Sequence, residues 1–88
     1  MSLALIEYDI QVQKYTAGTA ITTNCIDLLF INTGTVTAYI DTLPLLAGQS
    51  LPINGNLGEI TKKPRQLTFA NTAGNTEVYF VKRFYISG

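Results

Sequence analysis

Alternation of apolar and polar residues with a period of two runs through most of this chain, and it constrains the fold more than any other feature. Across residues 4–13, apolar side chains occupy the even positions and acidic or amide side chains occupy most of the odd ones. Alternate residues of a strand point to opposite faces, whereas a helix would place apolar residues three and four apart. We therefore expect a strand over 4–13, with its even residues in the core and its odd residues in water.

A β-hairpin is predicted over residues 24–42. Its strands cover 24–32 and 35–42 and are joined at Thr33-Gly34-Thr35, because glycine favours a tight reversal. This register gathers six apolar residues on one face: Ile26, Leu28, Phe30, Val36, Ala38 and Ile40. The first strand also carries apolar residues on its other face, which places it in the centre of a sheet.

Residues 65–86 predict a second hairpin, with strands over 65–71 and 77–86. Its turn lies at 73–75, which would set Phe69 opposite Phe80. The last strand is apolar on both faces for most of its length, and tyrosine and arginine are enriched where proteins contact one another. The side of this strand away from the core is therefore our candidate subunit interface: Tyr79, Val81, Arg83 and Tyr85.

The turn signals between these units indicate many short strands. Residues 43–58 hold two prolines and three glycines, so we expect turns there around one short strand at 50–54. Eighty-eight residues provide for one domain, spanning 1–88. The fold class is all-β, either a small antiparallel β-sandwich or a jelly-roll-like barrel of six to eight short strands. Periodicity does not set strand order, so both topologies stay open.

The composition excludes several classes of function. The chain has no histidine and one cysteine, so histidine-based catalytic triads and zinc sites built from nitrogen and sulfur ligands are excluded within one chain. We expect no catalytic residue, no cofactor and no metal site, and the chain is not expected to be an enzyme. The net charge of zero lacks the basic excess of nucleic-acid-binding proteins. Its apolar runs are far shorter than the ~20 residues that cross a bilayer, and its first residues lack the features of a signal peptide.

Carboxylate pairs are the remaining catalytic option, and each has a simpler interpretation. Glu7 and Asp9 share one face of the first strand, where we expect a solvated surface. Asp27 and Asp41 would lie on one face of the first hairpin and could form an acid pair or a calcium site. A calcium ion takes six to eight oxygen ligands, more than this sequence supplies there.

A basic cluster and the single cysteine are expected to be structural. Lys62, Lys63 and Arg65 surround a proline and could contact phosphate, but a neutral chain favours a solvated loop that discourages strand pairing. Cys25 is expected to be a small buried core residue.

Low charge indicates assembly. Only 14% of the residues are charged, against about 25% in ordinary soluble domains. A chain of this size has a thin stability margin, and oligomerisation commonly compensates for a small core. Part of the apolar surface is therefore expected to be covered by other subunits.

From Cys25 onward the chain resembles the small β-rich virion proteins of tailed bacteriophages and prophages. The resemblance is carried by turn and strand segments: Phe30-Ile31-Asn32-Thr33-Gly34, Leu45-Leu46-Ala47-Gly48-Gln49-Ser50, Asn54-Gly55-Asn56-Leu57-Gly58-Glu59-Ile60, Leu67-Thr68-Phe69 and Val81-Lys82-Arg83-Phe84-Tyr85. None of these is a catalytic signature.

The resemblance implies a non-catalytic structural protein of a phage head, neck or tail. Its partners would be copies of itself, as a homo-oligomer, and other virion proteins, with no nucleic acid and no membrane. It would be found in the virion or in the cytoplasm of the bacterial host. The alternative is a small carbohydrate- or ligand-binding β-sandwich module that stacks its ligand on tyrosines: Tyr8, Tyr15, Tyr39, Tyr79 or Tyr85.

Overall fold

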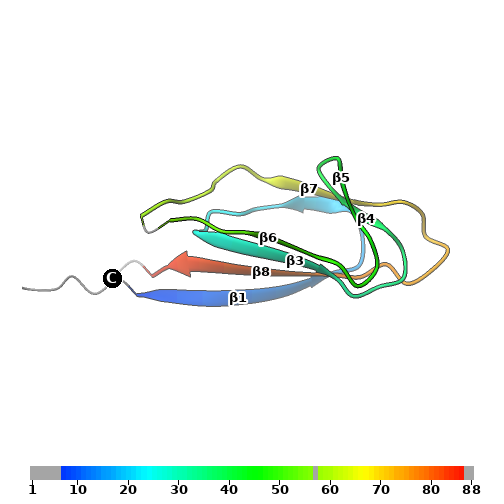
Figure 1. The fold of residues 1–88 in the computed structure, drawn as a ribbon, viewed down its shortest axis with the longest axis horizontal. Helices are drawn as coiled ribbons and strands as arrows, with labels where there is room; N and C mark the ends of the chain where they lie inside the picture. The colour runs from blue at the N-terminus through cyan, green and yellow to red at the C-terminus, as the bar shows by residue number, and fades with distance from the viewer. Residues whose placement is uncertain (1–6, 57, 87–88) are drawn as a thin grey trace, which may run out of the picture.

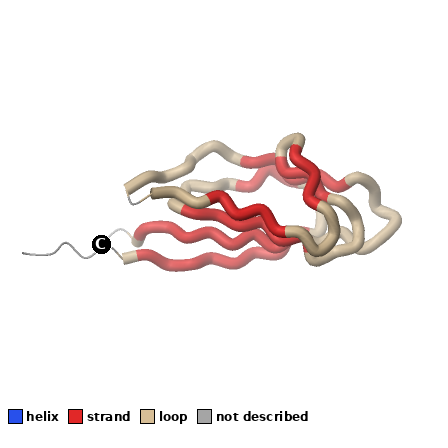
Figure 2. The backbone as a smooth tube through the Cα atoms, viewed as in Figure 1, coloured by secondary structure: helices blue, strands red, loops and turns tan. Residues whose placement is uncertain are grey.

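The computed structural model describes residues 7–56 and 58–86, and within them it contains eight β-strands and no helix (Figures 1 and 2). No helix long and apolar enough to cross a membrane therefore occurs in this part of the chain. The strands are β1 (Tyr8–Tyr15), β2 (Thr19–Ile21), β3 (Asp27–Asn32), β4 (Ala38–Ile40), β5 (Leu43–Leu45), β6 (Ser50–Ile53), β7 (Arg65–Phe69) and β8 (Val78–Tyr85).

The strands form two antiparallel sheets that face each other across one core. In the described residues, sheet A has the order β1-β8-β3-β6 and sheet B the order β2-β7-β4-β5. The first strand pairs with the last, the second with the seventh, the third with the sixth and the fourth with the fifth. A long hairpin rolled into two sheets in this way is a jelly roll. The predicted all-β sandwich is confirmed, and the structure supplies the strand order that periodicity left open.

The two predicted hairpins are wrong in their strand partners. β3 and β4 lie in different sheets, and so do β7 and β8. β3 pairs instead with β8, which sets Phe30 opposite Phe80, and β7 pairs with β4, which sets Leu67 opposite Ile40. The apolar faces that were assigned to one hairpin are buried equally well when the two strands face each other across the core. Period-two patterning does not distinguish these arrangements.

Close approach of two loops explains the glycine in the first predicted turn. The loop after β3 lies against the loop before β8, and Gly34 donates its amide to the carbonyl of Glu77 at 3.1 Å. A Cβ at Gly34 would lie 2.2 Å from the carbonyl oxygen of Asn75. A larger residue would therefore separate the two loops that cross between the sheets.

The core contains the inner faces of both sheets. The six residues predicted to share a face are all buried, although they face each other from two sheets. The rings of Phe30 and Phe80 stack with centroids 4.9 Å apart. One buried polar residue, Asn32, donates its side-chain amide to the carbonyls of Val36 and Leu45, both at 2.9 Å, and accepts the amide of Gly34 at 3.0 Å. Since Leu45 belongs to β5, this network ties sheet A to sheet B.

The first strand is present, but its orientation is opposite to the prediction. The even residues Tyr8, Ile10 and Val12 are exposed rather than buried, and Ala4 and Ile6 lie outside the described residues. Gln13 lies opposite Phe80 and therefore shares the side that faces sheet B. The strand of sheet B at the same side of the sandwich, β2, has three residues, too few to cover the inner side of β1. The short strands β2 and β5 were not predicted.

Candidate interaction surface

The side of sheet A that faces away from sheet B, here called the outer face, is apolar across all four strands. Its residues follow from the pairing registers, since directly opposite residues of an antiparallel pair lie on the same side. The central row crosses the sheet from β1 to β6 and holds no polar side chain: Val12, Val81, Leu29 and Pro52.

The rows on either side of the central row add polar groups at the margins. Towards one end lie Ile10, Arg83 and Asp27, followed by Tyr8 opposite Tyr85. Towards the other end lie Lys14, Tyr79, Ile31 and Ser50. An apolar centre inside a polar and aromatic margin is the usual composition of a protein–protein contact.

Exposure is highest on strand β1. Tyr8, Ile10 and Val12 keep 54%, 55% and 60% of their surface exposed. Large apolar side chains at successive outward positions of one strand form a contiguous patch. Patches of this kind on the surface of a protein mark sites of interaction.

The charged groups at one end of the face are already paired. Arg83 forms an ion pair with Asp27, and its guanidinium carbon lies 5.3 Å from the centre of the Tyr8 ring. Asp27 also accepts the amide of Gly55 at 2.6 Å. These contacts fix the direction of the arginine and leave the aromatic and aliphatic groups beside it as the free surface.

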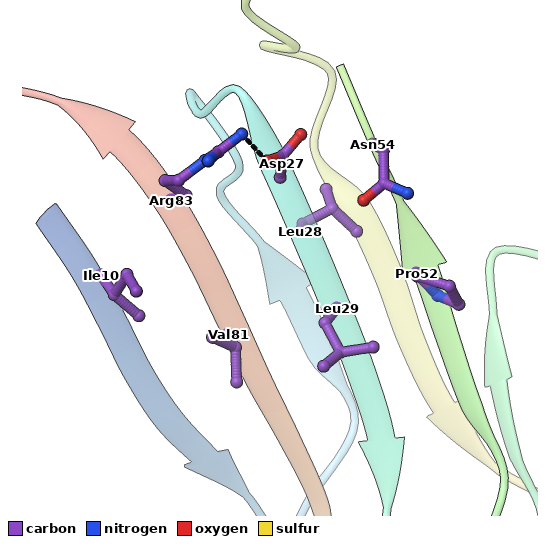
Figure 3. Close-up of a pocket in the computed structure, with 8 residues that line it drawn as sticks. All are labelled: Ile10, Asp27, Leu28, Leu29, Pro52, Asn54, Val81 and Arg83. Carbon is purple, nitrogen blue, oxygen red and sulfur yellow. Dashed lines mark ion pairs between the residues drawn. The ribbon is translucent and has the colours of Figure 1, made fainter. Parts of the chain in front are cut away.

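A shallow depression of about 180 Å³ lies in the outer face (Figure 3). Its walls are mostly apolar, from Ile10, Leu29, Pro52 and Val81, with the Arg83–Asp27 pair at one end. Pockets that enclose small ligands usually measure about 300–1,000 Å³. The depression suits a side chain inserted from a protein surface better than a small ligand that must be enclosed.

The four residues of the predicted subunit interface all lie on this outer face and are half-buried. The prediction missed the parts of the face that β1, β3 and β6 contribute, and on β1 the apolar residues were assigned to the core. The signal available in the sequence was the pairing partner: an apolar row on β1 beside the outward row of β8 gives a continuous surface. That partner is not encoded in the alternation itself.

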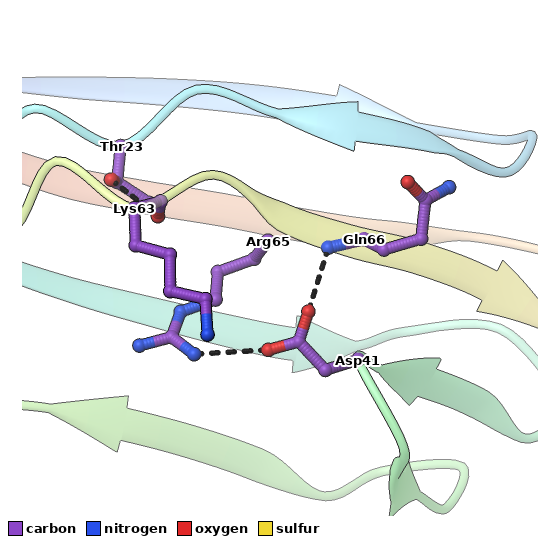
Figure 4. Close-up of polar contacts among 5 residues, drawn as sticks. All are labelled: Thr23, Asp41, Lys63, Arg65 and Gln66. Atoms are coloured by element: carbon purple, nitrogen blue, oxygen red, sulfur yellow. Dashed lines mark hydrogen bonds and ion pairs between the residues drawn. The ribbon is translucent and has the colours of Figure 1, made fainter.

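The two carboxylates proposed as an acid pair are not brought together. Asp27 lies on sheet A beside Arg83, whereas Asp41 follows β4 in sheet B and pairs with Arg65 at 2.9 Å (Figure 4). The amide of Gln66 donates to Asp41 at 3.0 Å. This hydrogen bond, and secondly Arg65, lower the pKa of Asp41. Within the described residues no group of three or more potential metal-binding side chains occurs.

The other candidates have structural environments. Cys25 is buried, as predicted, and burial raises the pKa of its thiol. Of the basic cluster, Lys62 and Lys63 are exposed and Arg65 is the partner of Asp41. Glu7 and Asp9 are exposed on β1 and its approach.

The tyrosines proposed as ligand platforms do not form one site. Tyr15 packs against the core, where burial raises its pKa, and Tyr39 is on the outward side of sheet B. The remaining three belong to the outer face of sheet A: Tyr8, Tyr79 and Tyr85.

Comparison of the chain with protein-family models, curated proteins and solved structures finds no match.

Proposed function

We propose that this protein is a non-catalytic structural subunit of a tailed bacteriophage or prophage particle, in its head, neck or tail, and that it acts by assembling with copies of itself and with other virion proteins. The observation that carries the proposal is the apolar outer face of sheet A, which extends over all four strands. The predicted interface, Tyr79, Val81, Arg83 and Tyr85, provides the β8 part of it.

The energetics favour covering this face. Burying Ile10 or Val12 fully is worth roughly 1.5–3 kcal/mol for each side chain. Their exposed fractions of 55% and 60% mean that more than half of that free energy is available to a partner. Association costs several kcal/mol in lost translation and rotation, so a few such residues together are needed for a stable contact. The central row and β1 supply them.

The fold is compatible with the proposal. Jelly rolls occur in viral capsid proteins, in lectins and in cupins, and one fold serves many functions. The cupin metal site needs histidines, which this chain lacks. A face that is broad and apolar, with a depression of about 180 Å³, favours a macromolecular partner over a sugar or another small ligand.

The assembly is tested with a charge on the central row. We expect the wild type to be oligomeric at micromolar concentration in light scattering or sedimentation, and Val81→Lys to form smaller species. The matched control is Thr68→Lys, an outward residue of a central strand in sheet B, which should assemble like the wild type. Circular dichroism and thermal melting check that both variants fold, and Leu29→Lys repeats the test on β3. A wild type that is monomeric at every concentration, or a Val81→Lys variant that assembles normally, would overturn the proposal.

The particle context is tested independently by the genes on either side of the one that encodes this chain. Capsid, portal or tail genes beside it are expected. Neighbours that encode carbohydrate metabolism would instead favour the ligand-binding module.

A further inference from the structure

Among residues 7–56 and 58–86, strand β1 is an open edge of sheet A, and it lacks the features that protect the other edges (Figure 1). In the part of the chain that the structure describes, the other edge strands, β2, β5 and β6, are three or four residues long, and β5 and β6 contain proline. Short strands and proline limit pairing with another chain. β1 has eight residues, no proline and an unbroken register with β8. It is therefore the edge best suited to receive an added strand.

The backbone groups of β1 that face this edge can be identified from its pairing with β8. The carbonyl of Glu7 accepts the amide of Ile86 at 3.0 Å, so Glu7 directs its backbone groups towards β8. Hydrogen-bonded positions alternate along an antiparallel pair. The even residues consequently direct their amides and carbonyls to the open edge: Tyr8, Ile10, Val12 and Lys14. In agreement, the amide of Ile10 is bonded by the neighbouring carboxylate of Asp9, at 2.7 Å, and not by β8.

We propose that a second copy of the chain adds its own β1 to this edge, antiparallel, about a two-fold axis at Gln11. The four outward-directed residues of β1 pair completely with one another in only one symmetric register. In that register Tyr8 lies opposite Lys14 of the second copy, and Ile10 lies opposite Val12 of the second copy. With the axis at Ile10, Lys14 of each copy would pair with a residue outside this set. With the axis at Val12, Tyr8 of each copy would do so. Gln11 faces its own symmetry mate in a pair without backbone hydrogen bonds.

The side chains are compatible with this register. Asp9 lies opposite Gln13 of the second copy, so no like charges face each other across the two strands. An axis at Asp9 would instead place two carboxylates directly opposite each other, which is destabilising. Ile10 beside Val12 forms a cross-strand pair of β-branched residues, the kind that stabilises sheets. Charge and apolar pattern thus favour the same register as the backbone.

This pairing rests on the proposed assembly role and deepens it by naming the partner and the contact. The even residues pair with even residues, so both outer faces lie on the same side of the joined sheet. The two copies of sheet A then form one sheet of eight strands with a continuous apolar face. A larger apolar surface is available for the next contact in an assembly than one chain alone provides.

A cysteine at the proposed axis tests the register. In a pair without hydrogen bonds the two Cα atoms are about 4.5 Å apart, within the range that a disulfide spans. Gln11→Cys should form a disulfide-linked dimer under mild oxidation on a non-reducing gel. Gln13→Cys is the matched control, because it has the same residue type on the same strand and side, but its symmetry mate would be about 14 Å away.

Pairing raises the effective thiol concentration from micromolar towards millimolar, so Gln11→Cys should cross-link more than about tenfold faster than Gln13→Cys. The wild type, whose Cys25 is buried, should not cross-link. Equal rates, or faster linkage of Gln13→Cys, would overturn the register.

A proline separates edge pairing from packing of the outer face. Val12→Pro removes an amide that faces the open edge and leaves the hydrogen bonds to β8 intact, so the fold should persist by circular dichroism while the edge-paired dimer is lost. Combined with Val81→Lys, which acts on the outer face, it should give a monomer. If the wild type assembles and Val81→Lys disrupts the assembly, but Gln11→Cys does not cross-link preferentially, the edge contact is wrong and the proposed function stands. If Gln11→Cys cross-links preferentially while Val81→Lys has no effect, the edge contact stands and the role of the outer face is wrong.

Discussion

The two sheets of this sandwich have outward sides of opposite character. The outer face of sheet A carries a fully apolar central row, with aromatic residues and paired charges at its margins. The outward side of sheet B carries mostly small or polar residues from its four strands: Ala20, Gln66, Thr68, Tyr39 and Pro44. The inner sides of both sheets build the core. The difference indicates that the outward side of sheet B is exposed to solvent, whereas the outward side of sheet A is suited to burial against a partner.

The two sheets also differ in strand length, and the longer strands belong to sheet A. β1 and β8 of sheet A have eight residues each, whereas the strands of sheet B within the described residues have three to five. The long strands extend beyond the part of the core that sheet B covers. On their inner side there, Gln11 lies opposite Lys82 and Phe84 packs against the core, and their outer side holds Ile10, Arg83, Tyr8 and Tyr85. The additional length of these two strands enlarges the outer face of sheet A.

The largest expected effect comes from breaking the link that makes the two sheets one folding unit. Asn32→Leu removes the side chain that bonds the carbonyls of Val36 and Leu45 and the amide of Gly34. The Gly34 amide keeps the carbonyl of Glu77 as an acceptor, so two buried carbonyls lose the partner that Asn32 provides. Each buried polar group left without a partner costs about 1–3 kcal/mol, so the free energy of unfolding should fall by at least about 2 kcal/mol. Chemical denaturation measures this loss, which is a large part of the total stability of a small domain.

The control for Asn32→Leu is Asn71→Leu, the same change at an exposed turn where the side chain accepts only the amide of Ala73. We expect it to lose no more than about 1.5 kcal/mol, the usual value of a single hydrogen bond. Equal losses for the two variants would show that the Asn32 network does not join the sheets.

The same substitution on the edge strand of each sheet sharpens the comparison. Ile21 of β2 points into the core and is 1% exposed, whereas Ile10 of β1 points outward. Ile21→Ala should reduce the free energy of unfolding by about 2–5 kcal/mol, as buried truncations do. Ile10→Ala should change it by no more than about 0.5 kcal/mol at concentrations where the chain is monomeric, because it removes little buried surface.

Self-association should respond in the opposite order. Ile10→Ala should weaken it in sedimentation equilibrium, and Ile21→Ala should leave it unchanged under conditions where the variant is folded. A monomer strongly destabilised by Ile10→Ala would mean that the Ile10 side chain packs in the core, as the alternation in the sequence predicted.

The sequence predicted side-chain faces better than strand partners. Alternation identified Leu28, Phe30, Ala38 and Ile40 as core residues, because burial of one side of a strand leaves a period of two whichever strand lies opposite. It could not show that β3 and β4 belong to different sheets. A hairpin and a crossing between sheets bury the same residues, and only the loop contacts at Gly34 distinguish them.

Only the β8 part of the candidate site was predicted, for a related reason. The two-sided apolar pattern of β8 identified Tyr79 and Val81 as outward residues. Only one side of that strand can face the core, so its other apolar side has to face away from it. On β1 only one side is apolar, and the simplest assumption buries it. Which side of β1 faces sheet B depends on its register with β8, which sets Gln13 beside the core residue Phe80 and Val12 beside Val81; residues 8–15 do not contain this tertiary property.

The smallest expected effect concerns the ion pair between Asp41, which follows β4, and Arg65 at the start of β7 in sheet B. Asp41 has a positive φ of 57°, accepts the amide of Gln66 and pairs with Arg65, and these contacts lower its pKa. A carboxyl whose pKa is lowered by folding stabilises the fold above its ordinary pKa, near 3.8, and that stabilisation is lost as the pH falls through the lowered value. Asp41→Asn keeps a residue that tolerates positive φ and an oxygen that accepts the amide, but it removes the charge.

The melting temperature of Asp41→Asn should therefore lie slightly below that of the wild type at pH 7, and the two should converge as the pH falls below about 3.8. The effect should be small because the carboxylate and its arginine are partly exposed to solvent. Asp41→Ala serves as the control, since it adds backbone strain that does not depend on pH and should stay below the wild type throughout. A constant gap between Asp41→Asn and the wild type from pH 7 to pH 2 would show that the charge of Asp41 does not contribute. The ion pair of sheet B would then add nothing to stability, and the contrast between the sheets would rest on the apolar face of sheet A alone.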